Sequence, residues 1–208
     1  MNRLTILAAL IAAPFIMTPA IPERPKIRPK EDTDMNNPYT VRIGRYDVDL
    51  LNPQPEQIDL EAIAANLDKT LRWTSNPQAL SVRQHQLAVG HLARKAAAPP
   101  NVVDWGEHHD DHEGIIGDIT GPIKAILAKH TPLLARMENR LDYAICVRRK
   151  ANYPSDETKG MVHYFDKLCE TLEWRFILCR EPMPWLRQLP VWMTEDHAKY
   201  FIMQYKDR

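Results

Sequence analysis

The sequence predicts an all-α fold, a helical bundle that carries a small β-hairpin near its N-terminal end. Three observations favour this class. Apolar residues recur at spacings of three and four in segments 82–96 and 161–176, as they do along one face of a helix. Strict alternation of apolar and polar residues is confined to residues 39–50. The chain has seventeen prolines but only seven glycines, which is typical of helices joined by stiff turns.

The starts and ends of these elements follow from local signals. Alternation on either side of Gly44 predicts a hairpin over residues 39–50. Asp59 is expected to cap a helix over residues 60–71, and Ser81 with Gln84 forms a capping box for a helix that ends near Ala98. The remaining predicted helices run from near Val102 to before Gly117, from Gly121 and Pro122 as a short segment, from Thr131 and Pro132 as a long one, from Ser155 to about Arg180, and after Thr194.

One folded domain is expected over residues 39–208, because no linker divides this stretch and domains usually have about 100–200 residues. Residues 1–38 differ from it. The first twenty contain Arg3, an apolar run and the small Ala20, which is the layout of a secretory signal. The residues that follow form a polar, proline-rich linker whose composition is typical of disordered segments. Two interpretations remain: export, or a natural protein that starts near Met35, so that everything before it is a non-native extension.

Charge and cysteine content exclude several classes of protein. Lysine plus arginine equals aspartate plus glutamate at 27 each, so no global field favours a nucleic-acid polymer or an acidic membrane surface. An anionic ligand would have to be held by local groups. Three cysteines are too few and too widely spaced for a zinc–cysteine cluster, and their odd number suits a reducing compartment. We expect Cys146, Cys169 and Cys179 to be buried free thiols.

Two polar residues fall on or beside predicted apolar faces. His85 lies in the stripe formed by Val82, Val89 and Leu92, although a lone histidine in such a place is usually a hydrogen-bonded core residue. Asp166 lies at the edge of the apolar face of segment 161–176. Burying an aspartate costs several kcal/mol unless it is paired or binds a metal, so a partly solvated or arginine-paired aspartate is the alternative.

A dense run of polar residues, HHDDHE at positions 108–113, falls in the third predicted helix. His109 and Glu113 are four residues apart and would share a face, while Asp110 is rotated by about 100° and Asp118 follows in the next turn. Three separated segments thus offer metal-binding groups. Two imidazoles and two carboxylates suit a borderline or hard divalent ion. These four groups are His85, His109, Asp110 and Asp166.

With these residues the chain resembles the HD-domain phosphohydrolases, and among them the small nucleotidases of bacteria and phages. The resemblance rests on SVRQH at 81–85, HDDHEGIIGDITGPIK at 109–124 and FDKLCETLEW at 165–174, preceded by VDLLNPQPEQIDLEAIA and LRW. It extends along most of residues 39–208. The stretch HDxxE…GD…PxK, with a distant histidine before it and an aspartate after it, is specific, whereas the doublet alone is not. The resemblance implies an HD-domain helical bundle.

The resemblance also implies roles for individual residues. His85, His109, Asp110 and Asp166 match the ligands of a divalent metal ion, which could be Co, Mn, Zn or Mg. The other matching positions are Glu113 and Asp118 as the acidic pair beside the attacked phosphate, Arg72 and Lys124 as phosphate-binding groups, Trp73 and Pro122 as the lining of the base or sugar pocket, and His163, where some relatives have a phosphate-binding lysine. For Trp73, a core tryptophan at a helix end is the alternative.

The chain departs from the family pattern around the HD doublet. Gly106, Glu107 and His108 stand where apolar residues are usual, and Asp111 follows the doublet. These departures bear on how deeply that segment is buried. His108 and His112 have no counterpart in the family and are interpreted as supporting or surface groups.

The activity implied is hydrolysis of deoxynucleotides, with deoxyadenosine as the first expectation: a dATP triphosphohydrolase or a 5'-nucleotidase acting on dAMP and other monophosphates. Two alternatives stay open, a catalytically silent nucleotide sensor of the same fold and an exported structural or metal-binding protein. We expect a small-molecule nucleotide as ligand, no nucleic-acid polymer, no membrane contact of the folded domain, and a homo-oligomer. The expected location is the cytoplasm, or the host cytoplasm for a phage protein, with export as the alternative if residues 1–20 are a signal.

Overall fold

The computed structural model describes residues 37–180 and 188–206, and these are mostly helical with one small two-stranded antiparallel sheet. The predicted all-α class with a hairpin is therefore confirmed. The interpretation of the N-terminal segment concerns residues that lie outside the described ones, apart from its last two. Among the described helices, none combines the length and the apolar character needed to cross a bilayer.

The hairpin lies where the alternation predicts it. Strand β1 (Thr40–Ile43) pairs with β2 (Tyr46–Asp49), and the turn between them places Gly44 at φ +57°. A glycine adopts this left-handed conformation without the steric cost that a side chain would bring. Ile43 and Val48 point into the core and are buried.

Helices α2 (Leu60–Lys69) and α4 (Val82–Lys95) begin at the predicted caps. The Asp59 carboxylate accepts a hydrogen bond from the backbone N–H of Ala62, and Ser81 and Gln84 form a reciprocal capping box. Such caps satisfy N–H groups that have no partner within the helix. The other helical segments are η1 (Pro55–Gln57), α3 (Arg72–Ser75), α5 (Pro100–Gly106), α6 (Glu113–Ile116), α7 (Gly121–His130), α8 (Leu133–Arg149), α9 (Asp156–Leu172), the π-helical turn η2 (Glu173–Ile177) and α10 (Glu195–Lys206).

The third predicted helix is wrong as a continuous element. Helix α5 ends at Gly106, and residues 107–112 form successive turns before α6 begins. The reason lies in the side chain of His109, whose Nδ1 is 2.9 Å from the carbonyl oxygen of Gly106. In a continuing helix the backbone N–H of Asp110 would occupy that oxygen. His109 and Glu113 therefore do not share a helical face.

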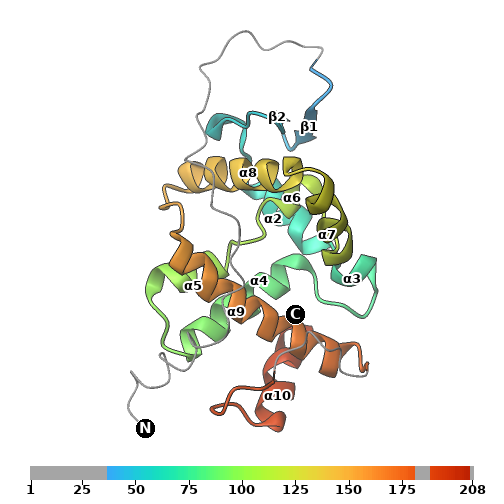
Figure 1. Cartoon of the computed structure of the whole chain (residues 1–208), viewed down its shortest axis with the longest axis vertical. Helices are drawn as coiled ribbons and strands as arrows, with labels where there is room; N and C mark the ends of the chain where they lie inside the picture. The colour runs from blue at the N-terminus through green and yellow to red at the C-terminus, as the bar shows by residue number, and fades with distance from the viewer. Residues whose placement is uncertain (1–36, 181–187, 207–208) are drawn as a thin grey trace.

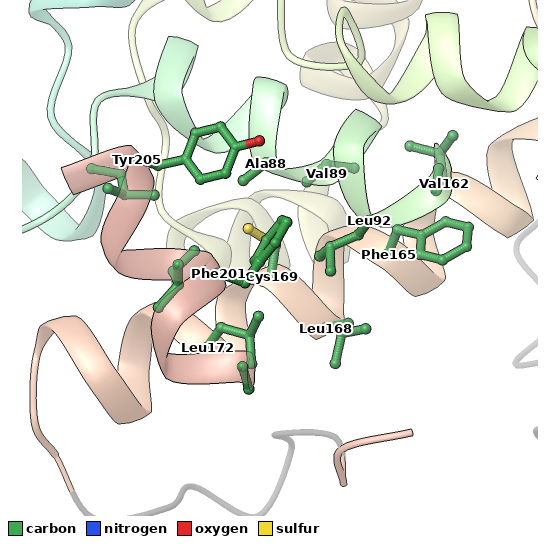
Figure 2. Packing of buried hydrophobic residues seen from close by; sticks show 14 of the residues in the cluster. Ala88, Val89, Leu92, Val162, Phe165, Leu168, Cys169, Leu172, Phe201 and Tyr205 are labelled. Carbon is green, nitrogen blue, oxygen red and sulfur yellow. The ribbon is translucent and has the colours of Figure 1, made fainter. Parts of the chain in front are cut away.

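Two apolar clusters organise the fold. The first joins α4, α5, α9 and α10, and Figure 2 shows Val89 and Leu92 of α4 facing Phe165 and Leu168 of α9. The second lies between the hairpin, α2 and α8. In Figure 1 the hairpin and α8 lie toward one end of the molecule and α10 toward the other, with α4 between them. Helix α4 contacts members of both groups, because it packs on α2 as well as on α5, α9 and α10.

The thiols differ from their predicted burial at one position. Cys146 and Cys169 are buried, as expected, but Cys179 is exposed. Cys179 lies beyond the end of the π-helical turn, with a backbone φ of +48°, so the apolar face of α9 does not extend to it.

Helices α2 and α6 approach so closely that only a glycine fits between them. A Cβ on Gly114 would lie 2.8 Å from both the carbonyl oxygen and Cγ2 of Ile63. We expect Gly114→Ala to lower the free energy of unfolding by about 1–3 kcal/mol, because a backbone atom cannot move aside as a flexible side chain can. Urea unfolding measures the change. Gly121→Ala is the matched control, since nothing lies within 4 Å of its Cβ position. Equal unfolding midpoints for both variants would contradict the close contact.

Candidate metal centre

The centre is built around His85, which is fully buried on α4. Its Nδ1 lies 2.5 Å from Oε1 of Glu173, and its Nε2 lies 3.1 Å from Oδ1 of Asp166. A carboxylate that accepts the Nδ1–H of a histidine orients the ring and leaves the lone pair of Nε2 for a ligand, as in many metal sites. His85 is therefore held between two carboxylates in the manner of a metal ligand.

His109 reaches the same point from the turns that follow α5. Because its Nδ1–H is donated to the Gly106 carbonyl, Nε2 faces the carboxylates, 3.2 Å from Oδ2 of Asp110 and 4.0 Å from Oδ1 of Asp166. The His85 and His109 rings lie with their centroids 5.5 Å apart. The four residues expected to bind a metal thus converge from three segments far apart in the sequence.

The donor set fits a divalent cation. Ligand atoms of His85, His109 and Asp166 all lie within 4.8 Å of one another, and Nε2 of His109 is buried with no hydrogen-bond partner in the described part of the chain. The immediate surroundings hold six carboxylates against three permanently cationic side chains. The carboxylates are those of Asp110, Glu113, Asp118, Asp166, Glu170 and Glu173, and the cations are Arg72, Lys124 and Lys167. A cation would offset this excess of negative charge.

The protonation states of the ligands follow from these contacts. Burial alone would raise the pKa of Asp166, but the hydrogen bond from His85 and the charge of Lys167 outweigh it, so its pKa lies well below the ordinary value. The pKa of Asp110 is also lowered, because the charge and the hydrogen bond of His109 outweigh the effect of burial. Both carboxylates are therefore ionised at neutral pH, which is the form that binds a metal.

Glu113 differs from these ligands in its protonation. It begins α6, is almost fully buried, and its Oε1 lies 3.3 Å from Nζ of Lys124 on α7. Burial, with the charge of Asp110, raises its pKa to about 7, against the opposing effect of Lys124. The pKa of Asp118 is also raised, first by burial. A carboxyl group with a pKa near neutrality can both accept and donate a proton.

Lys124 has a second carboxylate partner that the sequence did not indicate. Its Nζ lies 3.1 Å from Oε1 of Glu138 on α8, in addition to the contact with Glu113. Although burial opposes the charge of Lys124, these two carboxylates raise its pKa. The ammonium group is thus held between α6 and α8, beside the centre.

Arg72 is more deeply engaged than a free phosphate-binding group would be. Its guanidinium is buried and lies near three carboxylates: Nε is 3.1 Å from Glu173, Nη2 is 3.5 Å from Glu170 and Nη1 is 3.8 Å from Asp110. Its charge is therefore balanced by the protein before any anion binds. A phosphate could contact it only by sharing these nitrogens with the carboxylates.

The side chain of Trp73 is held by two neighbours in the structure. Its indole Nε1–H donates to Oε2 of Glu173 at 2.7 Å, and its ring packs on Trp174 with centroids 5.1 Å apart. The backbone here is left-handed, with φ of 56°, 60° and 57° at Trp73, Thr74 and Ser75. Three such residues in a row are sterically costly and are tolerated where the surroundings hold them. These contacts correspond to the structural alternative considered for Trp73.

The remaining predicted site residues lie at the periphery. Pro122 is exposed in the first turn of α7. His163 is one turn before Asp166 on α9, largely exposed, with Nδ1 3.9 Å from Oδ2 of that aspartate. Nothing in the described structure joins Pro122 to Trp73 in a base pocket.

Several groups of the centre were missed from the sequence. Glu173 is the most important, because it contacts Arg72, Trp73 and His85 at once. Its place seven residues after Asp166, within the predicted helix from Ser155 to about Arg180, was the available signal. Lys167 was also missed and lies 3.5 Å from Asp166 and 2.7 Å from Glu170.

The polar run at 108–113 is more buried than its composition indicates. His112 is not a surface group: its Nδ1 lies 2.8 Å from Oδ1 of Asp142, and it is 5% exposed. Although burial opposes its charge, Asp142 raises its pKa to about 9. Asp111 is buried as well and accepts a hydrogen bond from Gln86 at 3.0 Å, while His108 contacts Asp111 at 2.9 Å. The run is anchored to α4 and α8.

Comparison with known proteins adds a relative but no activity. No family model matches the chain. Over 111 residues it is 34% identical to a protein of Rhodobacter capsulatus that is described as uncharacterized. The aligned region covers 49% of this chain and 53% of that protein, so the chain spans about half the length of the curated relative it matches.

Proposed function

We propose that this protein is a metal-dependent phosphohydrolase of the HD-domain type that acts on deoxynucleotides or nucleotides. The observation that carries the proposal is the convergence of His85, His109, Asp110 and Asp166, with both Nε2 atoms directed at carboxylates and one of them left without a hydrogen bond among the described residues. Two imidazoles and two carboxylates suit Co²⁺, Mn²⁺, Zn²⁺ or Mg²⁺. The sequence resemblance implies a metal at the same four residues.

The residues around this set supply what hydrolysis of a phosphate ester requires. When bound, a divalent ion lowers the pKa of water and offsets the negative charge that develops around phosphorus. Glu113, with a pKa of about 7, can accept a proton from an attacking water or return one to the leaving oxygen. Asp118, whose pKa is also raised, is the second such group. Lys124 holds Glu113 in place and brings a positive charge to the phosphate.

Binding of the substrate would change the contacts of Arg72. A phosphate that approaches the centre competes with Glu170 and Asp110 for the guanidinium, whereas the contact with Glu173 is the shortest of the three. Lys167 provides a further cation beside Asp166. The aromatic face of Trp73 offers a surface for a base, where stacking is worth about 1–3 kcal/mol. Deoxyadenosine nucleotides remain the first substrates to test.

The decisive experiment incubates the purified protein with mono-, di- and triphosphates of the common nucleosides and deoxynucleosides. Each is combined with Co²⁺, Mn²⁺, Zn²⁺ or Mg²⁺, and phosphate, pyrophosphate and triphosphate are separated as products. Release of triphosphate identifies a triphosphohydrolase, and release of phosphate from monophosphates identifies a nucleotidase. Nucleotide binding without turnover under any condition would refute the enzyme and favour the sensor. Neither binding nor turnover would refute both.

Glu113→Gln separates chemistry from metal binding. We expect this variant to keep the ion held by His85, His109, Asp110 and Asp166, but to lose about 10²–10⁴-fold in kcat, because an amide cannot exchange the proton. Steady-state kinetics together with elemental analysis measures both effects. Glu157→Gln, at an exposed position in the first turn of α9, is the control and should retain wild-type turnover. Wild-type turnover in Glu113→Gln would show that the proton is transferred elsewhere.

A further inference from the structure

Helix α7, which carries Lys124, has no buried residue. Its large apolar side chains Ile123 and Ile126 are 51% and 59% exposed, and in Figure 1 the helix lies at the edge of the molecule beside α8. The segment that leads into it is also open, because a Cβ built on Gly117 or Gly121 would meet nothing within 4 Å. Burial of an apolar face usually docks a helix, but here it does little to fix the position of Lys124.

Ion pairs take the place of packing. The ammonium group of Lys124 lies 3.1 Å from Oε1 of Glu138 and 3.3 Å from Oε1 of Glu113. Glu138 is the nearer of the two carboxylates and belongs to α8, which Leu141 and Ile145 anchor in the second apolar cluster. A charge on a well-packed helix thus faces a charge on a helix without buried residues.

Glu138 is itself held from another side. Its side chain is 18% exposed, and its Oε1 is buried. Nε2 of His112 lies 3.7 Å from that oxygen, while Nδ1 of His112 lies 2.8 Å from Asp142, one turn further along α8. The orientation of Glu138 therefore depends on α8 and His112, whereas that of Lys124 depends on Glu138.

We propose that Glu138 is a positioning residue, which holds the ammonium group of Lys124, and with it α7, beside the candidate metal centre. Glu138 is not one of the metal ligands and acts through Lys124. A lysine side chain loses conformational entropy when it binds a phosphate, and a carboxylate that holds it in place beforehand reduces that loss. The consequence for phosphate binding rests on the proposed function, whereas the contact between the two helices does not.

Amide hydrogen exchange tests the contact without any substrate. In the full-length protein, Glu138→Gln should lower the protection factors of the α7 amides by about 10-fold and leave those of α8 unchanged, because local opening of α7 no longer breaks this ion pair. Lys124→Met should lower them at least as much, since it removes both ion pairs, and adding Glu138→Gln to it should have no further effect. Lys129→Met, which alters an exposed lysine of the same helix, is the matched control and should exchange like the wild type.

Steady-state kinetics tests the consequence for the substrate, with the nucleotide and metal ion that give the highest turnover. If Glu138 acted on the substrate only through its own negative charge, Glu138→Gln would lower KM for the anion. Loss of a residue that positions a phosphate-binding ammonium has the opposite effect, so we expect Glu138→Gln to raise KM by about 10-fold and to change kcat by less. In the Lys124→Met background the same substitution should not raise KM further.

The outcomes separate this inference from the proposed function. Wild-type exchange of α7 in Glu138→Gln, or a KM that is unchanged or lowered, would overturn the role of Glu138 and leave the proposed enzyme intact. Faster exchange of α7 in a protein that turns over no nucleotide would do the reverse. If Glu138→Gln does not fold, Glu138→Asp takes its place; it withdraws the charge by one methylene and should change exchange and KM in the same directions.

Discussion

Replacing Asp166 by alanine is expected to remove the ion held with His85, His109 and Asp110 and to lower phosphohydrolase turnover by about 10³-fold. Asp166 is the component of the set that arrives from α9, and its Oδ1 is within 3.1 Å of Nε2 of His85 and 4.0 Å of Nε2 of His109. Without it, only His85 of α4 and the two residues of the turns after α5 remain as ligands. Elemental analysis of dialysed protein and steady-state kinetics measure the two losses.

The control for this variant is Asp104→Ala. Asp104 also makes an ion pair, with Arg149 at 2.8 Å, but its side chain is 50% exposed and it lies outside the centre. Its removal should leave metal content and turnover unchanged. Circular dichroism checks that Asp166→Ala is folded. A folded Asp166→Ala that keeps its full metal content and activity would mean that the centre is elsewhere.

Replacing Glu173 by leucine is expected to destabilise the protein by about 3–5 kcal/mol, which is typical when one partner of a buried ion pair is removed. Glu173 is 1% exposed and accepts hydrogen bonds from Arg72 and Trp73 while it contacts Nδ1 of His85. Its loss would leave a buried guanidinium without its nearest carboxylate. Urea unfolding gives the change in free energy.

Glu195→Leu is the matched control for Glu173→Leu. Glu195 contacts Arg175 at 2.8 Å, yet its side chain is 61% exposed, and such surface pairs contribute about 0–1 kcal/mol. A destabilisation of Glu173→Leu no larger than that of Glu195→Leu would show that the buried network does not support the fold.

The same carboxylate should make stability depend on acidity. Burial alone would raise the pKa of Glu173, but the charges of Arg72 and His85 lower it from 4.5 to about 2. A lowered pKa in the folded state means that the stabilisation is complete above pH 4.5 and is lost as the pH falls toward 2. The unfolding free energy of the wild type should therefore fall more steeply over this range than that of Glu173→Leu.

Local signals in the sequence were sufficient for much of the fold. The caps at Asp59, Ser81 and Ser155 each bind a backbone N–H as predicted, because such contacts involve residues only three apart. The hairpin follows for a similar reason, since alternation and a turn glycine suffice to specify it. The prediction of a continuous third helix was wrong because the side chain of His109 binds the carbonyl oxygen of Gly106, which the next turn of a helix would need. Helical periodicity does not take such side-chain contacts into account.

For the centre, the residue types in SVRQH, in HDDHE and around Asp166 were enough to select the four groups that converge. Their partners were not predictable in the same way. Glu173 contacts residues 88 and 101 positions away, and which glutamate occupies that place depends on how α9 packs on α4. The raised pKa of Glu113 likewise depends on burial.

The sequence by itself determined the helical class, the starts of the capped helices and the choice of the four residues that are proposed to bind a metal. Only the tertiary structure decided that Arg72 is already paired, that Glu173 orients His85, and that His112 is buried beside Asp142. The physical reason is the range of the interactions. Caps and periodicity act over a few residues, whereas desolvation and ion pairing depend on which distant side chains the packed core brings together.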